Sequence, residues 1–236
     1  MSKRLQIIGI VLAVVGLGFV LGGGYAFLQV EDGYESLQAF SEAENVTLSY
    51  NEDGELIDRG TTEGAAAIML LLTAPASEGG WAYPVIEQDL DPNDPLVNTA
   101  TEYMYQMATI GYHVLHGTQT VVLTAEAEYN GEVFPAGTYE VPVDGKYWSD
   151  FDRQHPLEGP ARAQAWTGTT HALFGTLGVG TVTASTLQLA QAVSFILLGF
   201  GITFMALGGG LVWAGWSKDD FVPVTIEDRT PEPVRV

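Results

Sequence analysis

The sequence predicts an integral membrane protein of the α class, with two transmembrane helices and an inserted extracytoplasmic α+β domain. Two long uncharged stretches predict the helices. Residues 5–30 carry no charge, and His171 is the one ionisable residue between Arg162 and Lys218. The segment between the two helices holds 24 acidic and four basic residues, which is typical of a chain that faces water rather than lipid.

Composition narrows the class of protein. The 236 residues include no cysteine, which excludes a disulfide scaffold, a cysteine-ligated zinc or iron–sulfur site and a thiol enzyme. The 9 Lys+Arg against 29 Asp+Glu leave a formal net charge of −20, which argues against nucleic acid as a partner. The acidity fits two interpretations: a solvated, self-repelling exported surface, or a surface that collects cations or a basic partner.

The first transmembrane helix is expected within residues 1–30. Its apolar core, Leu5–Phe27, exceeds the roughly 20 residues that a helix needs to cross a bilayer. A cleaved signal peptide typically has an apolar core of about 7–15 residues. We therefore interpret this segment as a retained N-terminal anchor in contact with the lipid bilayer.

The second transmembrane helix is expected at residues 187–216, where Trp213 and Trp216 fit an aromatic belt. The preceding residues 161–186 are rich in Gly and Thr, a composition that makes a poor independent span. We expect this interfacial segment to contain a helix near residues 161–177, lying on the domain or on the membrane surface. A short break should then precede the second span.

The basic residues predict the orientation in the cell membrane. Lys3 and Arg4 precede the first helix, Lys218 follows the second, and positively charged flanks stay in the cytoplasm. Both termini are therefore expected in the cytoplasm and residues 31–186 outside it. The tail, residues 217–236, contains three prolines and is expected to be disordered and cytoplasmic.

Residues 31–160 are expected to form one acidic extracytoplasmic α+β domain, large enough to bury a core. Two hairpin turns are predicted, one at residues 51–54 and one at Asn130-Gly131. The strands expected around these turns are Val46–Tyr50, Glu55–Asp58, Thr120–Tyr129, Glu132–Phe134 and Thr138–Val143.

Two helices are expected in this domain. The apolar run Glu63–Thr73 is too short to span a bilayer, so it should be buried. A longer helix is predicted from Asp94, as the N-cap, and Pro95, at the first helical position, to a stop at Gly117. Its faces are scarcely polar, which predicts a central position in the domain.

Small residues recur at four-residue spacing along both predicted spans. They are Gly18, Gly22 and Ala26 in the first, and Ala206, Gly210 and Ala214 in the last. Such strips let helix backbones approach closely in lipid. In the expected topology they lie at different depths, so Gly9 and Ala13 are better placed to meet Ala206 and Gly210. The outer strip would then be free for a third helix, unless it reflects the general glycine enrichment of membrane helices.

His113 and His116 form an H-x-x-H pair near the end of the long helix. Residues three apart share a helix face, so both rings can reach one divalent metal. Glu102 lies 11 residues earlier, roughly 16 Å along the helix, and cannot join them. A third ligand would come from His155, His171, Asp150 or Asp152. Alternatively, both histidines simply occupy a helix C-terminus, where the dipole favours positive charge.

Asp89, Asp91 and Asn93 match the first three ligand positions of an EF-hand loop. The match then fails, because Asp94 stands where the loop needs Gly and Ala100 where it needs Glu. Two interpretations remain: a looser calcium site, or an aspartate-rich turn that leads into the helix.

The segment from Asp144 to His155 is dense in aromatic and polar side chains. Tyr147, Trp148 and His155 are candidates for the rim of a ligand-binding site. The alternative is a β-turn with an aromatic anchor and an Arg–Asp pair. Nucleotide-binding glycine loops and serine-hydrolase motifs are absent from the sequence, and no catalytic carboxylate pair can be singled out.

The chain resembles a family of uncharacterised actinobacterial membrane proteins with two spans and one exported domain. The resemblance rests on Gly145-Lys146-Tyr147 through Phe151-Asp152-Arg153, on the small and hydroxyl residues of 161–186, and on the closing segment 208–213. Some members carry the label "aromatic ring-opening dioxygenase". Such chemistry would place two histidines and a carboxylate around iron, and the H-x-x-H pair supplies the histidines alone. The resemblance therefore implies a location and an architecture rather than a reaction.

Together these features favour a non-catalytic protein of the cell envelope. We expect an accessory or assembly subunit of a larger membrane complex, or a homo-oligomer, with no resident cofactor. A metal-binding or metal-dependent domain that uses His113 and His116 is the second hypothesis. An extracytoplasmic ligand-binding module near Tyr147, Trp148 and His155 is the third.

Overall fold

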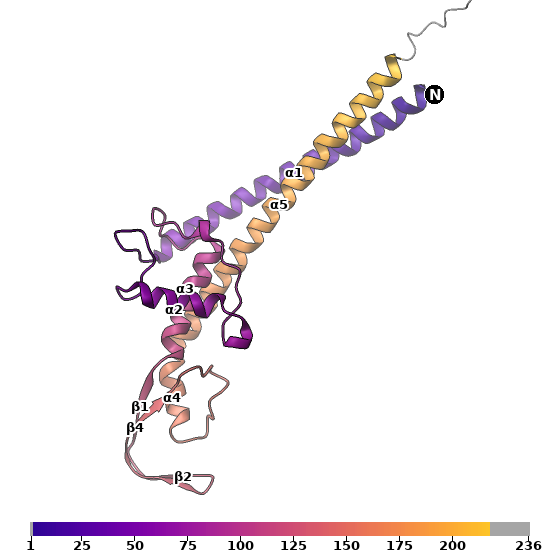
Figure 1. Ribbon diagram of the computed structural model, residues 1–236. Helices are drawn as coiled ribbons and strands as arrows, with labels where there is room; N and C mark the ends of the chain where they lie inside the picture. The colour runs from indigo at the N-terminus through magenta and orange to yellow at the C-terminus, as the bar shows by residue number, and fades with distance from the viewer. Residues whose placement is uncertain (1, 218–236) are drawn as a thin grey trace, which may run out of the picture. The chain divides into compact units, whose positions relative to one another are not determined.

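The computed structural model describes residues 2–217. The chain divides into two compact units, one made of Met1–Glu31 with Leu189–Val236 and the other of Asp32–Gln188. Apart from Ser217, the expected disordered tail lies outside the described residues. The described part is mostly helical and has a small β region (Figure 1).

Two helices are long and apolar enough to cross a membrane by length and composition. They are α1, Ser2–Glu44, and α5, Gly168–Ser217. Only 11% of the most apolar window of each helix is buried, unlike the core helix of a soluble domain. Side chains such as Ile7, Leu21 and Ile202 are more than 60% exposed to the surroundings of the chain. This pattern fits helices whose apolar surface faces a nonaqueous solvent.

Helix α1 continues well beyond the anchor expected at residues 1–30. Residues 31–44 contain no proline, and Leu37 and Ser41 are buried in the second unit, so the helix gains packing by continuing. It ends where Asn45 adopts a positive φ of 50°, while the Asn45 N–H donates to the Ser41 carbonyl. This left-handed residue is a common way to stop a helix.

Helix α5 lacks the break that was expected after residue 177. The interruption comes earlier, at Trp166 and Thr167, between α4, Glu158–Ala165, and α5. Hydroxyl side chains do not break α5, because Thr181, Ser194 and Thr203 donate to carbonyl groups four residues back along the helix. Gly180 also lets α5 pack closely against Tyr103, because a Cβ at this position would lie only 2.5 Å from the Tyr103 ring.

The larger core of the second unit surrounds α2, Thr62–Thr73, and α3, Ala100–Leu115. The prediction of α2 is confirmed, but one face alone is buried, and Leu70 is 64% exposed. Helix α3 is central as expected, with eight buried positions. Two short 3₁₀ turns, η1 at Ala76–Glu78 and η2 at Glu87–Asp89, lie in the connection between the two helices.

The predicted start of α3 at Asp94 and Pro95 is wrong. Thr99 is the N-cap, and its side chain and that of Glu102 form a reciprocal capping box. The residues before it are extended instead: the Leu48 N–H donates to the Pro95 carbonyl, and the Val97 N–H to the Val46 carbonyl. These long-range bonds satisfy backbone groups that a longer helix would have used. At the other end, Gly117 has a φ of 112° and follows the C-cap, as predicted.

The β region consists of two antiparallel pairs. Strands β1, Thr118–Leu123, and β4, Gly137–Pro142, form the first pair, and β2, Ala127–Tyr129, and β3, Glu132–Phe134, form the second. The Asn130-Gly131 turn is confirmed, since both residues have positive φ. The strand expected at Thr120–Tyr129 is interrupted between β1 and β2, and the first predicted hairpin forms isolated bridges rather than strands.

A smaller core joins β1 and β4 to α4 and the loop before it. Val121, Val143, Phe151, Ala161 and Ala165 are buried there. Figure 1 shows α4 beside the paired strands, in agreement with the contacts between α4 and β1. This core positions the loop that carries the aromatic and basic side chains described below.

Candidate functional site

The H-x-x-H pair lies at the end of α3, and each ring has its own partner. His113 Nε2 lies 3.1 Å from Asp58 Oδ1, and both side chains are mostly buried. His116 Nδ1 lies 2.8 Å from the Tyr112 carbonyl oxygen, and the His116 ring packs 4.2 Å from the Tyr112 ring. Asp58 is therefore a carboxylate partner of His113 that the sequence did not suggest, because it lies 55 positions earlier in the chain.

The four residues considered as a third metal ligand have local partners as well. His155 Nδ1 accepts from the Leu157 N–H at 3.1 Å, and its ring packs against Tyr129 and Phe134. His171 Nδ1 bonds the Thr167 carbonyl. Asp150 and Asp152 accept backbone N–H groups within their own loop. Within residues 2–217 no three His, Asp or Glu side chains gather in a way that could hold a metal ion.

Asp89, Asp91 and Asn93 lie in a tight turn before α3. Asp91 Oδ1 accepts from the Asn93 N–H at 2.8 Å and from the Asn93 side-chain amide at 2.9 Å, and these bonds lower the pKa of Asp91. Asp89 Oδ2 is buried without a hydrogen-bond partner among the described residues. The turn leads into the extended residues before Thr99 rather than directly into the helix.

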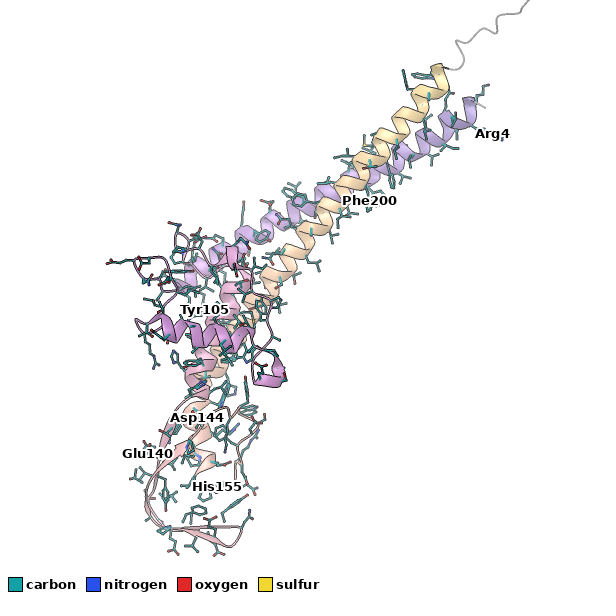
Figure 2. The ribbon with its side chains drawn as sticks, in the orientation of Figure 1. Arg4, Tyr105, Glu140, Asp144, His155 and Phe200 are labelled. Atoms are coloured by element: carbon teal, nitrogen blue, oxygen red, sulfur yellow. The ribbon has the colours of Figure 1, made fainter. Side chains whose placement is uncertain are left out.

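A polar hollow of about 180 Å³ opens between the residues around Asp58 and the side of α3. Its walls include Thr47, Ser49, Arg59 and Gln106. Tyr105 also lines it, and Figure 2 labels this residue on α3. The Tyr105 hydroxyl is buried without a partner in the described part of the chain. Burial, followed by the charge of Asp58, raises the pKa of Tyr105 to about 12.

The segment after β4 builds a cluster of aromatic rings. The Trp81 indole N–H donates to the Tyr147 hydroxyl at 2.7 Å, and Tyr147 packs 6.0 Å from Trp166. Trp166 in turn packs against His171 and Phe174. Of the three predicted rim residues, Tyr147 and His155 are half-buried, whereas Trp148 is 41% exposed. Figure 2 labels Asp144 and His155 in this part of the chain.

The same segment contains the expected turn but a different pairing of charges. The Asp150 N–H donates to the Tyr147 carbonyl, which closes the turn. The expected Arg–Asp pair is replaced by stacking of Arg153 over the Trp148 ring, with its Cζ 4.5 Å from the ring centroid. Lys146 pairs with Glu158 at 2.7 Å and lowers the pKa of that carboxyl group.

The first unit holds α1 and α5 together through glycines that recur every seven residues. A Cβ at Gly9 would lie 2.6 Å from the Gly208 carbonyl oxygen, and one at Gly16 would lie 2.7 Å from that of Gly201. Gly23 packs closely against Leu197 and Leu198. We name this contact the glycine seam; its members are Gly9, Gly16, Gly23, Gly201 and Gly208. The seven-residue spacing is the sequence signal that could have predicted this contact, whereas the four-residue strips could not.

The strip predicted on α1 lies outside the glycine seam. A Cβ at Gly18 or Gly22 would meet nothing within 4 Å, and the same holds for Gly210 on α5. Gly18 and Gly22 line an apolar hollow of about 230 Å³, together with Val15, Phe19 and Leu197. We name these five residues the open glycine face. Gly9 and Ala13 meet Gly208 rather than Ala206 and Gly210, because α5 is rotated relative to the expected pairing.

Comparison with known protein families, with curated proteins and with solved structures finds no match for this chain. The resemblance to the actinobacterial two-span family therefore stays a prediction from the residues that carry it.

Proposed function

We propose that this chain is a non-catalytic membrane subunit that binds another transmembrane helix through its open glycine face. The partner helix belongs to a second copy of the chain or to another membrane protein of a larger complex. The proposal is supported by a difference between two sets of glycines. One set forms the glycine seam between α1 and α5, whereas Gly18 and Gly22 border a hollow that no described residue fills.

Helices associate in lipid for a different reason than in water. Helices gain little from burying apolar surface there, so close van der Waals contact between backbones decides which faces associate. Gly18 and Gly22 are four residues apart, and both line the hollow without a side chain to fill it. Phe19 and Leu197 also line it, so a helix with a complementary ridge would gain contacts that lipid chains supply poorly.

The proposal includes a location and a topology. In it, α1 and α5 cross the cell membrane, both termini are cytoplasmic, and residues 31–186 are outside. The basic residues Lys3, Arg4 and Lys218 support this orientation, as does the acidity of the segment between the spans. Because the chain lacks cysteine, the single substitutions Lys3→Cys and Thr138→Cys can test it. A membrane-impermeant maleimide should label the Thr138→Cys variant in intact cells, and should label the Lys3→Cys variant after lysis alone.

Site-directed crosslinking tests the partner. The variant Gly22→Cys can carry a benzophenone maleimide, and the matched control is Leu21→Cys at the neighbouring position, where the native side chain is 64% exposed. Irradiation in native membranes should give a discrete protein adduct from position 22, and mass spectrometry would identify it as a second copy or another protein. Equal products from both positions, or lipid adducts alone from position 22, would refute the proposal.

A filling substitution provides a second test. Gly22→Leu should occupy the hollow and shift the gently solubilised protein to a smaller assembly, measured by light scattering after size-exclusion chromatography. Gly24→Leu is the control, since a Cβ at Gly24 also meets nothing within 4 Å but the residue does not line the hollow. Wild type that runs as a monomer, with no crosslinked partner, would contradict the proposed role.

A further inference from the structure

Two guanidinium groups stack on one exposed indole ring. The Arg162 Cζ lies 3.9 Å from the centroid of the Trp148 ring, and the Arg153 Cζ lies 4.5 Å from it. Trp148 is 41% exposed, so the stack is accessible from solvent. Residues 31–186 contain only four basic side chains, and two of them meet at this ring.

Neither arginine is neutralised by a carboxylate among the described residues. The ion pairs within 4.0 Å are His113–Asp58 and Lys146–Glu158. The acidic side chains nearest in sequence have other donors, and Glu158, four residues before Arg162, accepts from Lys146 and the Asp152 N–H. Asp150 accepts from the Tyr147 N–H and the Ser149 hydroxyl, and Asp152 accepts from the Tyr129 hydroxyl and the Gln154 N–H. Although this region holds 24 acidic residues, neither guanidinium group forms an ion pair within 4.0 Å among the described residues.

The stack is held in place before any ligand arrives. Arg162 is on α4, and its Nε donates to the Trp148 carbonyl oxygen at 2.9 Å, which leaves its terminal nitrogens available. The Trp148 ring also packs edge-on against His171, 5.2 Å away at the start of α5. Burial and the neighbouring charge of Arg153 lower the pKa of Arg162, as expected where like charges are close. A bound anion would relieve that repulsion.

We propose that Trp148, Arg153 and Arg162 form a binding site for an oxyanion, namely a phosphate or carboxylate group of a soluble ligand or polymer. Guanidinium groups donate two parallel hydrogen bonds to such groups, and both guanidinium groups lie within 4.5 Å of the centroid of one indole ring. The cation–π contacts orient the arginines and leave the terminal nitrogens of Arg162 and the guanidinium N–H groups of Arg153 available to a ligand. The site belongs to the second unit and the open glycine face to the first, and the proposed site does not depend on the proposed role of that face.

Ligand titration tests the proposal. The full chain, in nanodiscs of zwitterionic lipid at low salt, would be titrated with inorganic phosphate and with glucuronate by isothermal calorimetry. Binding of either probe supports the site, and the stronger probe identifies the preferred group. Arg153→Gln removes a guanidinium that makes no hydrogen bond within the described part of the chain, so it should weaken binding about tenfold or more without unfolding the loop.

The control is Arg59→Gln, which removes the same charge from another exposed arginine of this unit. It should leave the affinity within about twofold of wild type, and raising the salt concentration should weaken binding to wild type. Absence of binding to both probes would overturn the proposal. Equal affinities of the Arg153→Gln and Arg59→Gln variants for the anion would also overturn it, because the position of Arg153 beside Trp148 would then make no difference to binding.

Discussion

The glycine seam makes a sharp prediction about two neighbouring residues, Gly208 and Gly209. A Cβ at Gly208 would lie 2.5 Å from the Gly9 carbonyl oxygen and 2.7 Å from the Ala13 nitrogen, both backbone atoms that cannot rotate away. A Cβ at Gly209 would meet nothing within 4 Å. Gly208→Ala should therefore force α1 and α5 apart, whereas Gly209→Ala should fit without rearrangement.

The magnitude follows from comparing the two variants. Overpacking a close contact typically costs about 1–3 kcal/mol. Replacing helical glycine with alanine favours the helix by up to about 1 kcal/mol, and both variants share that gain. Their difference isolates the packing cost, which corresponds to roughly a 5- to 150-fold change in the unfolding equilibrium.

The assay is unfolding of the purified chain in mixed micelles with rising dodecyl sulfate, followed by energy transfer between dyes placed near the ends of α1 and α5. Gly208→Ala should lose energy transfer at a lower dodecyl sulfate fraction than wild type, and Gly209→Ala should not. Equal midpoints for the two variants would refute the seam as the contact that holds these helices together.

Two further predictions concern the second unit. Thr99→Ala should destabilise the chain by about 1 kcal/mol because it removes the N-cap of α3, whereas Asp94→Ala should change the unfolding free energy little, and denaturant titration would compare them. Burial raises the pKa of Tyr50 and of Tyr105 from 10.0 to about 12, so the stability that their protonated forms contribute is complete below pH 10 and is lost as the pH rises towards 12. Tyr105→Phe should flatten that loss in thermal unfolding between about pH 9 and pH 12; an unchanged slope would count against a shifted pKa.

The Trp148 stack and the His113–Asp58 pair each include a contact between side chains from different segments of the chain. Arg162 on α4 contacts Trp148 in the preceding loop, and His113 on α3 contacts Asp58 in the segment before α2. Sequence proximity suggested other partners: an aspartate for Arg153 and a shared metal for His113 and His116. Packing of α3, α4 and the loop after β4 selected the observed ones.

Several features were determined by the sequence alone, because their causes are local or periodic. The lengths of the two apolar stretches, the helix α2, the stop at Gly117 and the Asn130-Gly131 turn depend on composition and on residues within a few positions. A positive φ at Asn130 and Gly131, for example, follows from the side chains at those two positions. The same local chemistry predicts a membrane-spanning helix where about 20 consecutive residues are predominantly apolar as well as uncharged.

Other features depended on the tertiary structure, because their causes lie far apart in the chain. Helix α3 has its N-cap at Thr99 rather than at the predicted Asp94, because residues 95–97 are extended and hydrogen-bond to residues 46–48. Packing on Tyr103 and unbroken backbone bonding kept α5 continuous through its glycines. Whether a glycine belongs to the seam or to the open face depends on the rotation of α1 against α5, which only the contact between the two helices sets.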